Sequence, residues 1–286
     1  MRKFLGRLYS FSASWTGTII IVAFVIFFVA QAFVIPSGSM KNTLLIGDYL
    51  FVKKFSYGIP VPRIPWIEMR VLPDFQGNDH LINGDMPKRD DIVVFRSPQD
   101  DKVHFVKRLF AVGGDEIIVT EKNVFLHHHE GDEYIKANFK PEEIVTLNGK
   151  LFVHEPYKHK GVHYDKKVAM FDIMVYALNQ NKLAMKPLLL SELESHPNYD
   201  FNAFYFKVPQ DEFFMMGDNR DHSNDSRFWG TITYKHIVGK PWFIYFSWDN
   251  DYKIRWERIG RFIDSVENND EIVDLAIKEE EVDGLY

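Results

Sequence analysis

The sequence predicts a mainly β protein, in which one apolar N-terminal helix is followed by an antiparallel sheet of short strands. Aromatic residues make up 15% of the 286-residue chain, with 25 Phe, a composition that favours strands packed on an aromatic core. Short apolar runs bounded by turn residues recur after position 36. A single long uncharged segment precedes them. Together these features indicate one β-rich domain attached to one helix.

The N-terminal segment has no charged residue between Arg7 and Lys41. It contains the apolar run TGTIIIVAFVIFFVAQAFVI, and roughly 20 such residues span about 30 Å of hydrocarbon as a helix. We expect a transmembrane helix over residues 15–35, with the basic start keeping residues 1–14 in the cytoplasm and everything later outside. A secretory signal cleaved near residues 30–32 (AQA) is the competing interpretation. A buried core helix is disfavoured because the run is apolar on every face.

Short strands account for most of the remaining chain. The dipeptide Asn148-Gly149 lies between two apolar runs and is a strong signal for a two-residue hairpin. A second hairpin is expected around residues 121–123, and residues 116–205 are expected to form an inserted β-rich lobe. Helical periodicity is limited to residues 188–195 and an acidic stretch within 256–278. The other expected strands are residues 47–54, 91–95, 103–112, 204–208, 212–216 and 241–248.

Composition also excludes several classes of function. The chain has no cysteine, which excludes disulfides, thiol nucleophiles and cysteine metal ligands. A formal net charge of -6 gives no reason to expect a nucleic-acid partner. The three consecutive histidines of residues 127–129 would alternate between the two faces of a strand, so we expect an exposed loop and no metal site. Residues 264–286 are expected to be an acidic, solvated tail.

Two serines stand directly after the apolar segment, in the run IPSGSM of residues 35–40. Serine–glycine turns are common, so this run by itself is either a turn or the site of a nucleophile. Lys107 lies within the apolar run HFVKRLFAV, and burial there would disfavour the ammonium form and turn the lysine into a usable base. The other interpretation of this run is an ordinary strand in which Lys107 and Arg108 face water.

A third cluster, GDNRDHSNDSRFWG at residues 217–230, concentrates small hydrogen-bonding groups around two arginines. Asp218, Asp221 and Asp225 offer the oxygen ligands that calcium prefers, but their spacing does not match an EF-hand loop. The positive charges of Arg220 and Arg227 also argue against a bound cation. A rigid loop of interlocked hydrogen bonds is the alternative.

In order along the chain, IPSGSM, DIVVF, VKRLFAVGGD and GDNRDHSNDSRFWG resemble the motifs of bacterial type I signal peptidases, and they span residues 35–230. The resemblance implies a serine endopeptidase without a cofactor, held in the cytoplasmic membrane with its catalytic domain on the outer, periplasmic side. Its partners would be membrane lipid and the signal peptides of preproteins, which it would remove after Ala-X-Ala sites. The domains would then be residues 1–14, 15–35, 36–263 (catalytic) and 264–286.

The resemblance also implies roles for single residues. Ser39 matches the nucleophile and Lys107 matches the general base, a serine–lysine variant of the catalytic triad. Ser37 matches a hydroxyl that joins the backbone N–H of Ser39 in an oxyanion hole. The residues that match the support of the dyad are Ser223, which orients the lysine, and Arg108, Asp225 and Arg227. Those that match the pocket for small side chains are Ile35, Pro36, Met40 and Leu44.

Some positions depart from the family pattern. Asn42 stands where the family usually has proline, and Lys88-Arg89-Asp90-Asp91 replaces the commoner Arg-Gly-Asp. These departures bear on loop rigidity and fine specificity rather than on the reaction. Two other functions stay open: a self-cleaving serine–lysine regulator, and a membrane-anchored β-rich binding protein whose dyad is inert. The apolar segment argues against the first, and the presence of both dyad residues argues against the second.

Overall fold

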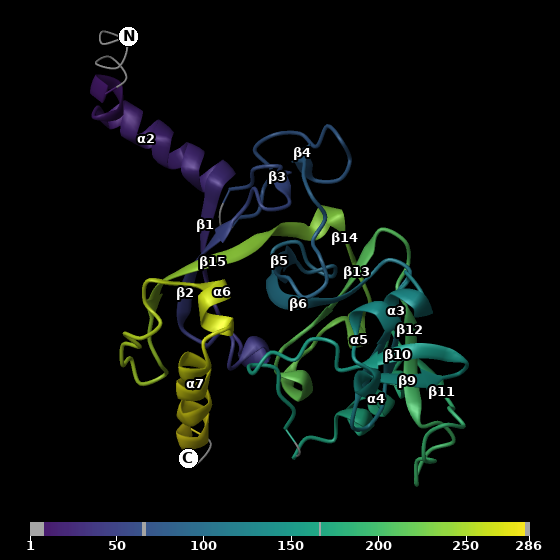
Figure 1. The fold of residues 1–286 in the computed structure, drawn as a ribbon. Helices are drawn as coiled ribbons and strands as arrows, with labels where there is room; N and C mark the ends of the chain where they lie inside the picture. The colour runs from purple at the N-terminus through teal and green to yellow at the C-terminus, as the bar shows by residue number, and fades with distance from the viewer. Residues whose placement is uncertain (1–8, 65–66, 166, 284–286) are drawn as a thin grey trace.

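The computed structural model describes residues 9–64, 67–165 and 167–283, and its core is a curled antiparallel sheet (Figure 1). This sheet has eight strands in the order β1-β2-β15-β5-β6-β13-β14, with β16 paired to β15. The predicted mainly β, antiparallel fold class is confirmed. The strands are β1 (Ala30–Val34), β2 (Asp48–Lys53), β5 (Ile92–Arg96), β6 (His104–Val112), β13 (Glu212–Met216), β14 (Ile232–Thr233), β15 (Ile237–Ser247) and β16 (Arg261–Phe262).

A second antiparallel sheet of six strands, in the order β11-β12-β7-β8-β10-β9, is built from the region predicted to be an inserted lobe. Its β9–β10 hairpin turns at Asn148 and Gly149, both with positive φ, as the dipeptide predicts. A small third sheet pairs β3 (Gly58–Pro60) with β4 (His80–Asn83). The strands of the second sheet are β7 (Glu116–Val119), β8 (Val124–His127), β9 (Ile144–Leu147), β10 (Lys150–His154), β11 (Lys186–Leu188) and β12 (Ala203–Lys207).

The N-terminal helix ends earlier than the sequence predicts. α2 (Trp15–Phe24) continues into a π-helical turn, Val25–Val29, and the chain then becomes β1. Residues 30–34 are therefore a strand, because their backbone pairs with β2 from Ala30↔Lys53 onward. Among the helices that the structure describes, none is both long and apolar enough to cross a membrane.

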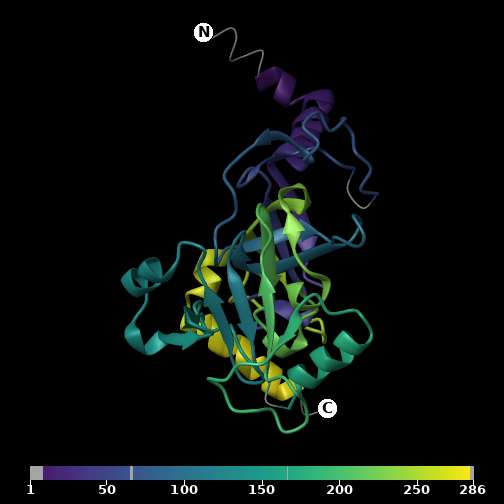
Figure 2. The same cartoon turned by 90° about the vertical axis from the view of Figure 1, so that its right-hand side faces the viewer.

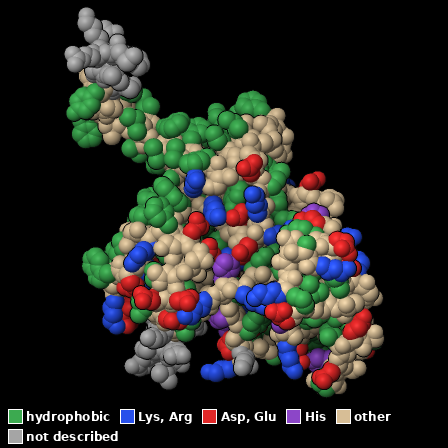
Figure 3. Space-filling model, viewed as in Figure 1, with side chains coloured by type: hydrophobic (Ala, Val, Ile, Leu, Met, Phe, Trp, Pro, Cys, Tyr) green, Lys and Arg blue, Asp and Glu red, His purple; other side chains and the backbone are tan. Residues whose placement is uncertain are grey.

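Helix α2 projects away from the two larger sheets (Figures 1 and 2). Apolar side chains cover this N-terminal arm (Figure 3), with Ile19 and Phe24 more than half exposed. Where the arm meets the sheet, buried Lys54 donates from Nζ to the carbonyl of Ile26 at 3.1 Å. That bond satisfies one of the acceptors left open at the end of the helix.

Of the two helical expectations, the one for residues 188–195 is wrong, and the one for the acidic stretch within 256–278 agrees with the helices found there. Residues 188–195 form the end of β11 followed by turns, whereas helices occur at α3 (Asp132–Asn138) and α4 (Met170–Asn179). The acidic C-terminal region is not simply solvated. It folds into α6 (Ile263–Glu267) and α7 (Asp270–Asp283), which bury apolar side chains against the large sheet because these recur at helical spacing. The buried side chains are Ile263, Val266, Ile272, Val273 and Ala276.

The expectation of an exposed histidine loop is also only partly right. His129 is partly exposed, but His128 is buried, with its ring 5.2 Å from that of Tyr134 and 5.0 Å from that of Phe139. Burial lowers the pKa of His128 to about 4, so this side chain is neutral and packs as an aromatic residue. His128 is therefore packed between aromatic side chains just after β8, rather than exposed on an open loop.

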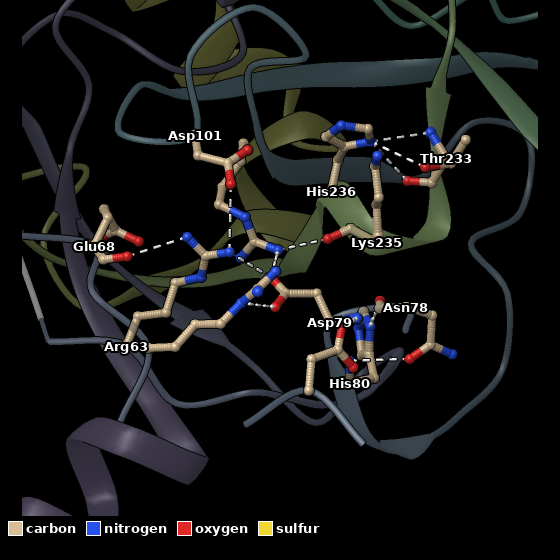
Figure 4. Close-up of polar contacts among 12 residues, drawn as sticks. Arg63, Glu68, Asn78, Asp79, His80, Asp101, Thr233, Lys235 and His236 are labelled. Atoms are coloured by element: carbon tan, nitrogen blue, oxygen red, sulfur yellow. Dashed lines mark hydrogen bonds and ion pairs between the residues drawn. The ribbon is translucent and has the colours of Figure 1, made fainter. Parts of the chain in front are cut away.

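The buried carboxylate of Asp79 connects the segment between β3 and β4 to the large sheet (Figure 4). Asp79, before β4, accepts from Arg63 at 2.7 Å and from Arg70 at 2.8 Å, and it also pairs with Arg96 of β5. Arg96 in turn donates to the carbonyl of Lys235, just before β15. Three arginines share this carboxylate. The connection between β3 and β4 is therefore attached to the large sheet by ion pairs, in addition to the hydrogen bonds of the small sheet.

Candidate active site

The structure brings Ser39 and Lys107 together. Ser39 lies on a single 3-10 turn, Gly38–Met40, that follows β1, and Lys107 lies in the middle of β6. Lys107 Nζ is 2.5 Å from Ser39 Oγ, although 68 residues separate them. Both side chains are buried, with exposed fractions of 8% for Ser39 and 3% for Lys107. A hydroxyl and an amine in contact in a dry setting form a nucleophile–base pair in the sense of the serine–lysine variants.

The surroundings of Lys107 make it a base. Burial lowers the pKa of its ammonium to about 8, Asp225 and Asp218 act in the opposite direction, and Arg227 lowers the pKa further. The ring of Phe105 lies 5.6 Å from Nζ. A lysine with a pKa near 8 has a usable neutral fraction at neutral pH and can accept a proton from a neighbouring hydroxyl.

The loop that begins at Gly217, directly after β13, fixes the backbone of Ser39. The Asn219 N–H donates to the carbonyl of Ser39 at 3.1 Å, and Asn219 Nδ2 donates to the carbonyl of Gly38 at 3.0 Å. A Cβ on Gly217 would lie 2.4 Å from the carbonyl oxygen of Ser39 and 2.4 Å from Ser223 Oγ. Only glycine therefore allows the loop to approach the serine turn so closely.

Arg108 and Asp218 form the first buried ion pair beside the dyad. Arg108 Nε and Nη2 donate to the two oxygens of Asp218, both at 2.8 Å, and the Thr43 hydroxyl donates to Asp218 at 2.6 Å. Burial by itself would raise the pKa of Asp218, but Arg108 holds it below its usual range. Arg108 also reaches Asp90 and, from the C-terminal α6, Glu267 at 3.0 Å. One guanidinium thereby joins the loop after β13 to α6, and Thr43 is tied to the same pair through Asp218.

Asp225 and Arg227 form the second pair. Arg227 Nε donates to Asp225 Oδ1 at 2.8 Å, and the N–H of Gly217 donates to Asp225 Oδ2 at 3.1 Å. Burial by itself would raise the pKa of Asp225, and the Arg227 guanidinium holds it below its usual range. Each carboxylate near Lys107 thus has its own arginine, which leaves the lysine free to lose its proton.

The other predicted site residues are placed as follows. Ser37 is exposed, with its Oγ 3.5 Å from Ser39 Oγ. Ser223 is buried beside Gly217 and helps to lower the pKa of Asp225, and the one side-chain bond of Lys107 in the described chain goes to Ser39 rather than to Ser223. Of the predicted pocket residues Pro36 is exposed, and the buried ones pack in one core cluster: Ile35, Met40 and Leu44.

Two departures from the family pattern have a backbone reason. Asn42 has a φ of 72°, which proline cannot adopt because its ring fixes φ near -65°. Asp90 has a φ of 78° at the position where the family pattern has glycine, and aspartate is one of the few other residues that enter this region. The Asp90 carboxylate then serves a second purpose, since it accepts from both Arg108 and His159.

Sequence reasoning missed Asn219 and Glu267, and it treated Asp218 only as a calcium ligand. One cluster has the ligand types of a metal site: Asp115, His129 and Glu130 bring their ligand atoms within 4.8 Å of one another. These residues do not fit a cation. The Arg89 guanidinium already occupies the space, donating to Asp115 at 2.7 Å and to Glu130 at 2.8 Å.

Comparison with known proteins places this arrangement in a family. The sequence profile described as "Signal peptidase, peptidase S26" matches residues 8–248. The chain belongs to this family of peptidases. It is 48% identical to Signal peptidase I of Helicobacter pylori strain 26695, over 93% of this chain and 96% of that protein. It is 32% identical to Signal peptidase I of Buchnera aphidicola (subspecies Acyrthosiphon pisum), over 90% of this chain and 81% of that protein.

A more distant match is a crystal structure of a signal peptidase I from Enterococcus faecalis. It aligns with 55% of this chain and 97% of its own at 18% identity, with a TM-score of 0.28, too low for a comparison of folds. The family membership rests on the sequence matches.

Proposed function

We propose that this chain removes N-terminal signal peptides from exported preproteins, with Ser39 as the nucleophile and Lys107 as the general base. The observation that carries the proposal is the 2.5 Å approach of Lys107 Nζ to Ser39 Oγ, together with the pKa of about 8 that burial gives the lysine. Membership of the signal peptidase family supports the choice of substrate.

The reaction follows from this pair. Neutral Lys107 takes the proton from Ser39 Oγ as that oxygen bonds to the scissile carbonyl carbon. The Ser39 N–H and the Ser37 hydroxyl would donate to the resulting oxyanion. The C–N bond then breaks, and Lys107 passes its proton to the leaving amine. Water, deprotonated by Lys107, hydrolyses the acyl ester and restores the serine.

We assign recognition of small side chains to the apolar wall next to the serine turn: Ile35, Pro36, Met40 and Leu44. Three of the four are buried in one cluster, which supports a rigid, shallow contact surface. We assign the pairs of Arg108 with Asp218 and of Arg227 with Asp225, together with Ser223, to the positioning of Lys107.

Cleavage of a preprotein bearing an Ala-X-Ala site, by the full chain in detergent, tests the proposed reaction. We expect one cut after the second alanine, identified by the mass of the mature product. Replacement of that alanine by Phe should lower kcat/KM by at least about a hundredfold, because a bulky side chain cannot enter a shallow pocket. The matched control places Phe at X, where we expect less than about a fivefold change. A preparation that leaves several such preproteins uncut would favour the inert binding protein instead.

We also propose that the N-terminal arm holds the protein in the cytoplasmic membrane, with residues 1–14 inside and the catalytic domain on the outer face. The exposed apolar side chains of α2 and the lack of charge between Arg7 and Lys41 support this arrangement. It would place Ser39 near the membrane surface, where a substrate held by its own apolar helix presents its cleavage site. Restriction of both partners to one plane raises their effective concentration.

Two charges in the arm test the membrane proposal. Each Asp at the centre of a membrane segment costs roughly 3 kcal/mol, so Ile20→Asp with Phe24→Asp should move most of the protein from the membrane fraction to the high-salt supernatant. The control, Leu189→Asp, changes an exposed apolar residue of the second sheet's rim and should stay with the membrane. Retention of the double variant in the membrane fraction would contradict the proposed anchor.

A further inference from the structure

α4 has two apolar stripes, only one of which is covered. Phe171, Met174 and Val175 are buried in the core beneath the second sheet. A second stripe at helical spacing includes Met170, which packs partly against the same core, and Ile173 and Tyr176, which are 44% and 69% exposed. A ten-residue helix that already has a covered core face does not need a second apolar stripe for folding, so the open stripe points to a binding role.

The open stripe forms one wall of a groove of about 980 Å³. The groove is also lined by the loop that begins at Gly217 and by the short helix after it, Ser226–Trp229. These contribute Ser223, Phe228 and Trp229. Lys182, Asp221 and His222 lie around it and carry mixed charge. The lining therefore combines apolar and polar side chains with charges of both signs, which suits a polypeptide of variable sequence.

The groove borders the candidate active site, because two of its lining residues contact the surroundings of Ser39 and Lys107. Trp229 stacks on Phe105 with ring centroids 6.3 Å apart, and the Phe105 ring lies beneath Lys107 Nζ. Ser223, which lines the groove, packs against Gly217, and Gly217 abuts the carbonyl of Ser39. The groove is thus linked to Lys107 through Phe105, and Ser37 does not line it.

This position fixes which part of a substrate the groove would meet. The base that activates the serine also protonates the leaving amine, so the leaving segment of the substrate must pass beside Lys107.

We propose that this groove binds the first residues of the mature protein, on the leaving side of the scissile bond. The inference rests on the proposed function and extends it to a second half of the substrate site. α4 is about 15 Å long and an extended chain rises about 3.3 Å per residue, so about five residues beyond the cut would lie along it. The chemistry of the wall favours an apolar or aromatic side chain among them.

Two peptide substrates with the same signal-peptide end test the inference. The long peptide continues for about six residues beyond the cut, enough to cross α4, and the short one ends in an amide after a single residue. The variant is Ile173→Ser with Tyr176→Ser, both at exposed positions, so the fold is kept. Leu189→Ser, an exposed apolar residue remote from the groove lining, is the matched control.

We expect the double variant to cut the long peptide with a kcat/KM about tenfold below wild type, mostly through KM, because apolar contact is lost. It should cut the short peptide within about twofold of wild type, and Leu189→Ser should match wild type on both. Equal losses on the two peptides, or no loss on either, would overturn the groove assignment while wild-type cleavage upholds the proposed function. A wild type that cuts neither peptide would overturn the proposed function and the inference with it.

Discussion

Lys107→Met is expected to abolish cleavage and yet to make the protein more stable below pH 8. Loss of the general base should lower kcat/KM by at least about a thousandfold, as for other members of a catalytic dyad. The stability gain arises because Lys107 is a buried cation without a carboxylate of its own. Asp218 and Asp225 keep their arginine partners when the lysine is removed, so no carboxylate is left unpaired.

The pH dependence of that gain has a definite sign. The pKa of Lys107 in the folded chain is about 8, below its ordinary 10.5, so between these values the unfolded chain binds a proton that the folded chain does not. Wild-type stability therefore rises with pH across this window, and below it the folded protein carries a cost of about 3 kcal/mol. Lys107→Met removes this cost, and its advantage should shrink above pH 8 and vanish above 10.5.

Urea unfolding of the full chain at pH 6, 8 and 10.5 measures the effect on stability, beside cleavage assays on the same preparations. Lys122→Met is the matched control, since it removes an exposed lysine and should change neither quantity appreciably. A Lys107→Met protein that is less stable than wild type at pH 6, or that cuts within tenfold of wild type, would contradict this account of the lysine.

Asp218→Ala is expected to be among the most destabilising single substitutions in the described chain, at about 3–5 kcal/mol, because it leaves the buried Arg108 cation without its principal partner. It also removes the acceptor of the Thr43 hydroxyl. The neighbouring Asn219 would then hold the Ser39 carbonyl less firmly. Activity should therefore fall even at temperatures where the variant remains folded.

The comparison is with an exposed ion pair of the same chain. Glu133→Ala breaks the exposed pair with Lys136, and exposed pairs contribute only about 0–1 kcal/mol. Urea midpoints of the two variants beside wild type measure the contrast. An Asp218→Ala midpoint as close to wild type as that of Glu133→Ala would show that the buried pair does not support the site.

The strands were the most predictable part of the fold, because alternation, Asn148-Gly149 and similar turns are local signals. The end of the N-terminal helix was not predictable. Residues 30–34 are uncharged and, apart from Gln31, apolar, so they read as a continuation of the helix, and only the pairing with β2 makes them a strand. A helix was expected in the acidic C-terminal stretch, but not the burial of Ile272, Val273 and Ala276 of α7, because most residues of this helix are charged.

In the candidate site, motifs singled out Ser39 and Lys107, which the structure brings together, whereas the pairing of the charged residues was not predicted. Arg108 meets Asp218 because β6 and β13 pair in a register that sets Arg108 opposite Met216, two residues before the aspartate. Register across strands about a hundred residues apart is a tertiary property. The role of Glu267 depends likewise on how α6 docks on the large sheet.

The most direct test of the central claim, that Ser39 is the nucleophile, is the initial rate of cleavage by Ser39→Ala. The account predicts no product above background for Ser39→Ala, a loss of about 10²–10³ for Ser37→Ala, which removes one oxyanion donor, and wild-type rates for the exposed control Ser191→Ala. If Ser39→Ala cuts the same bond within tenfold of wild type, the nucleophile is another group and the serine–lysine assignment is wrong.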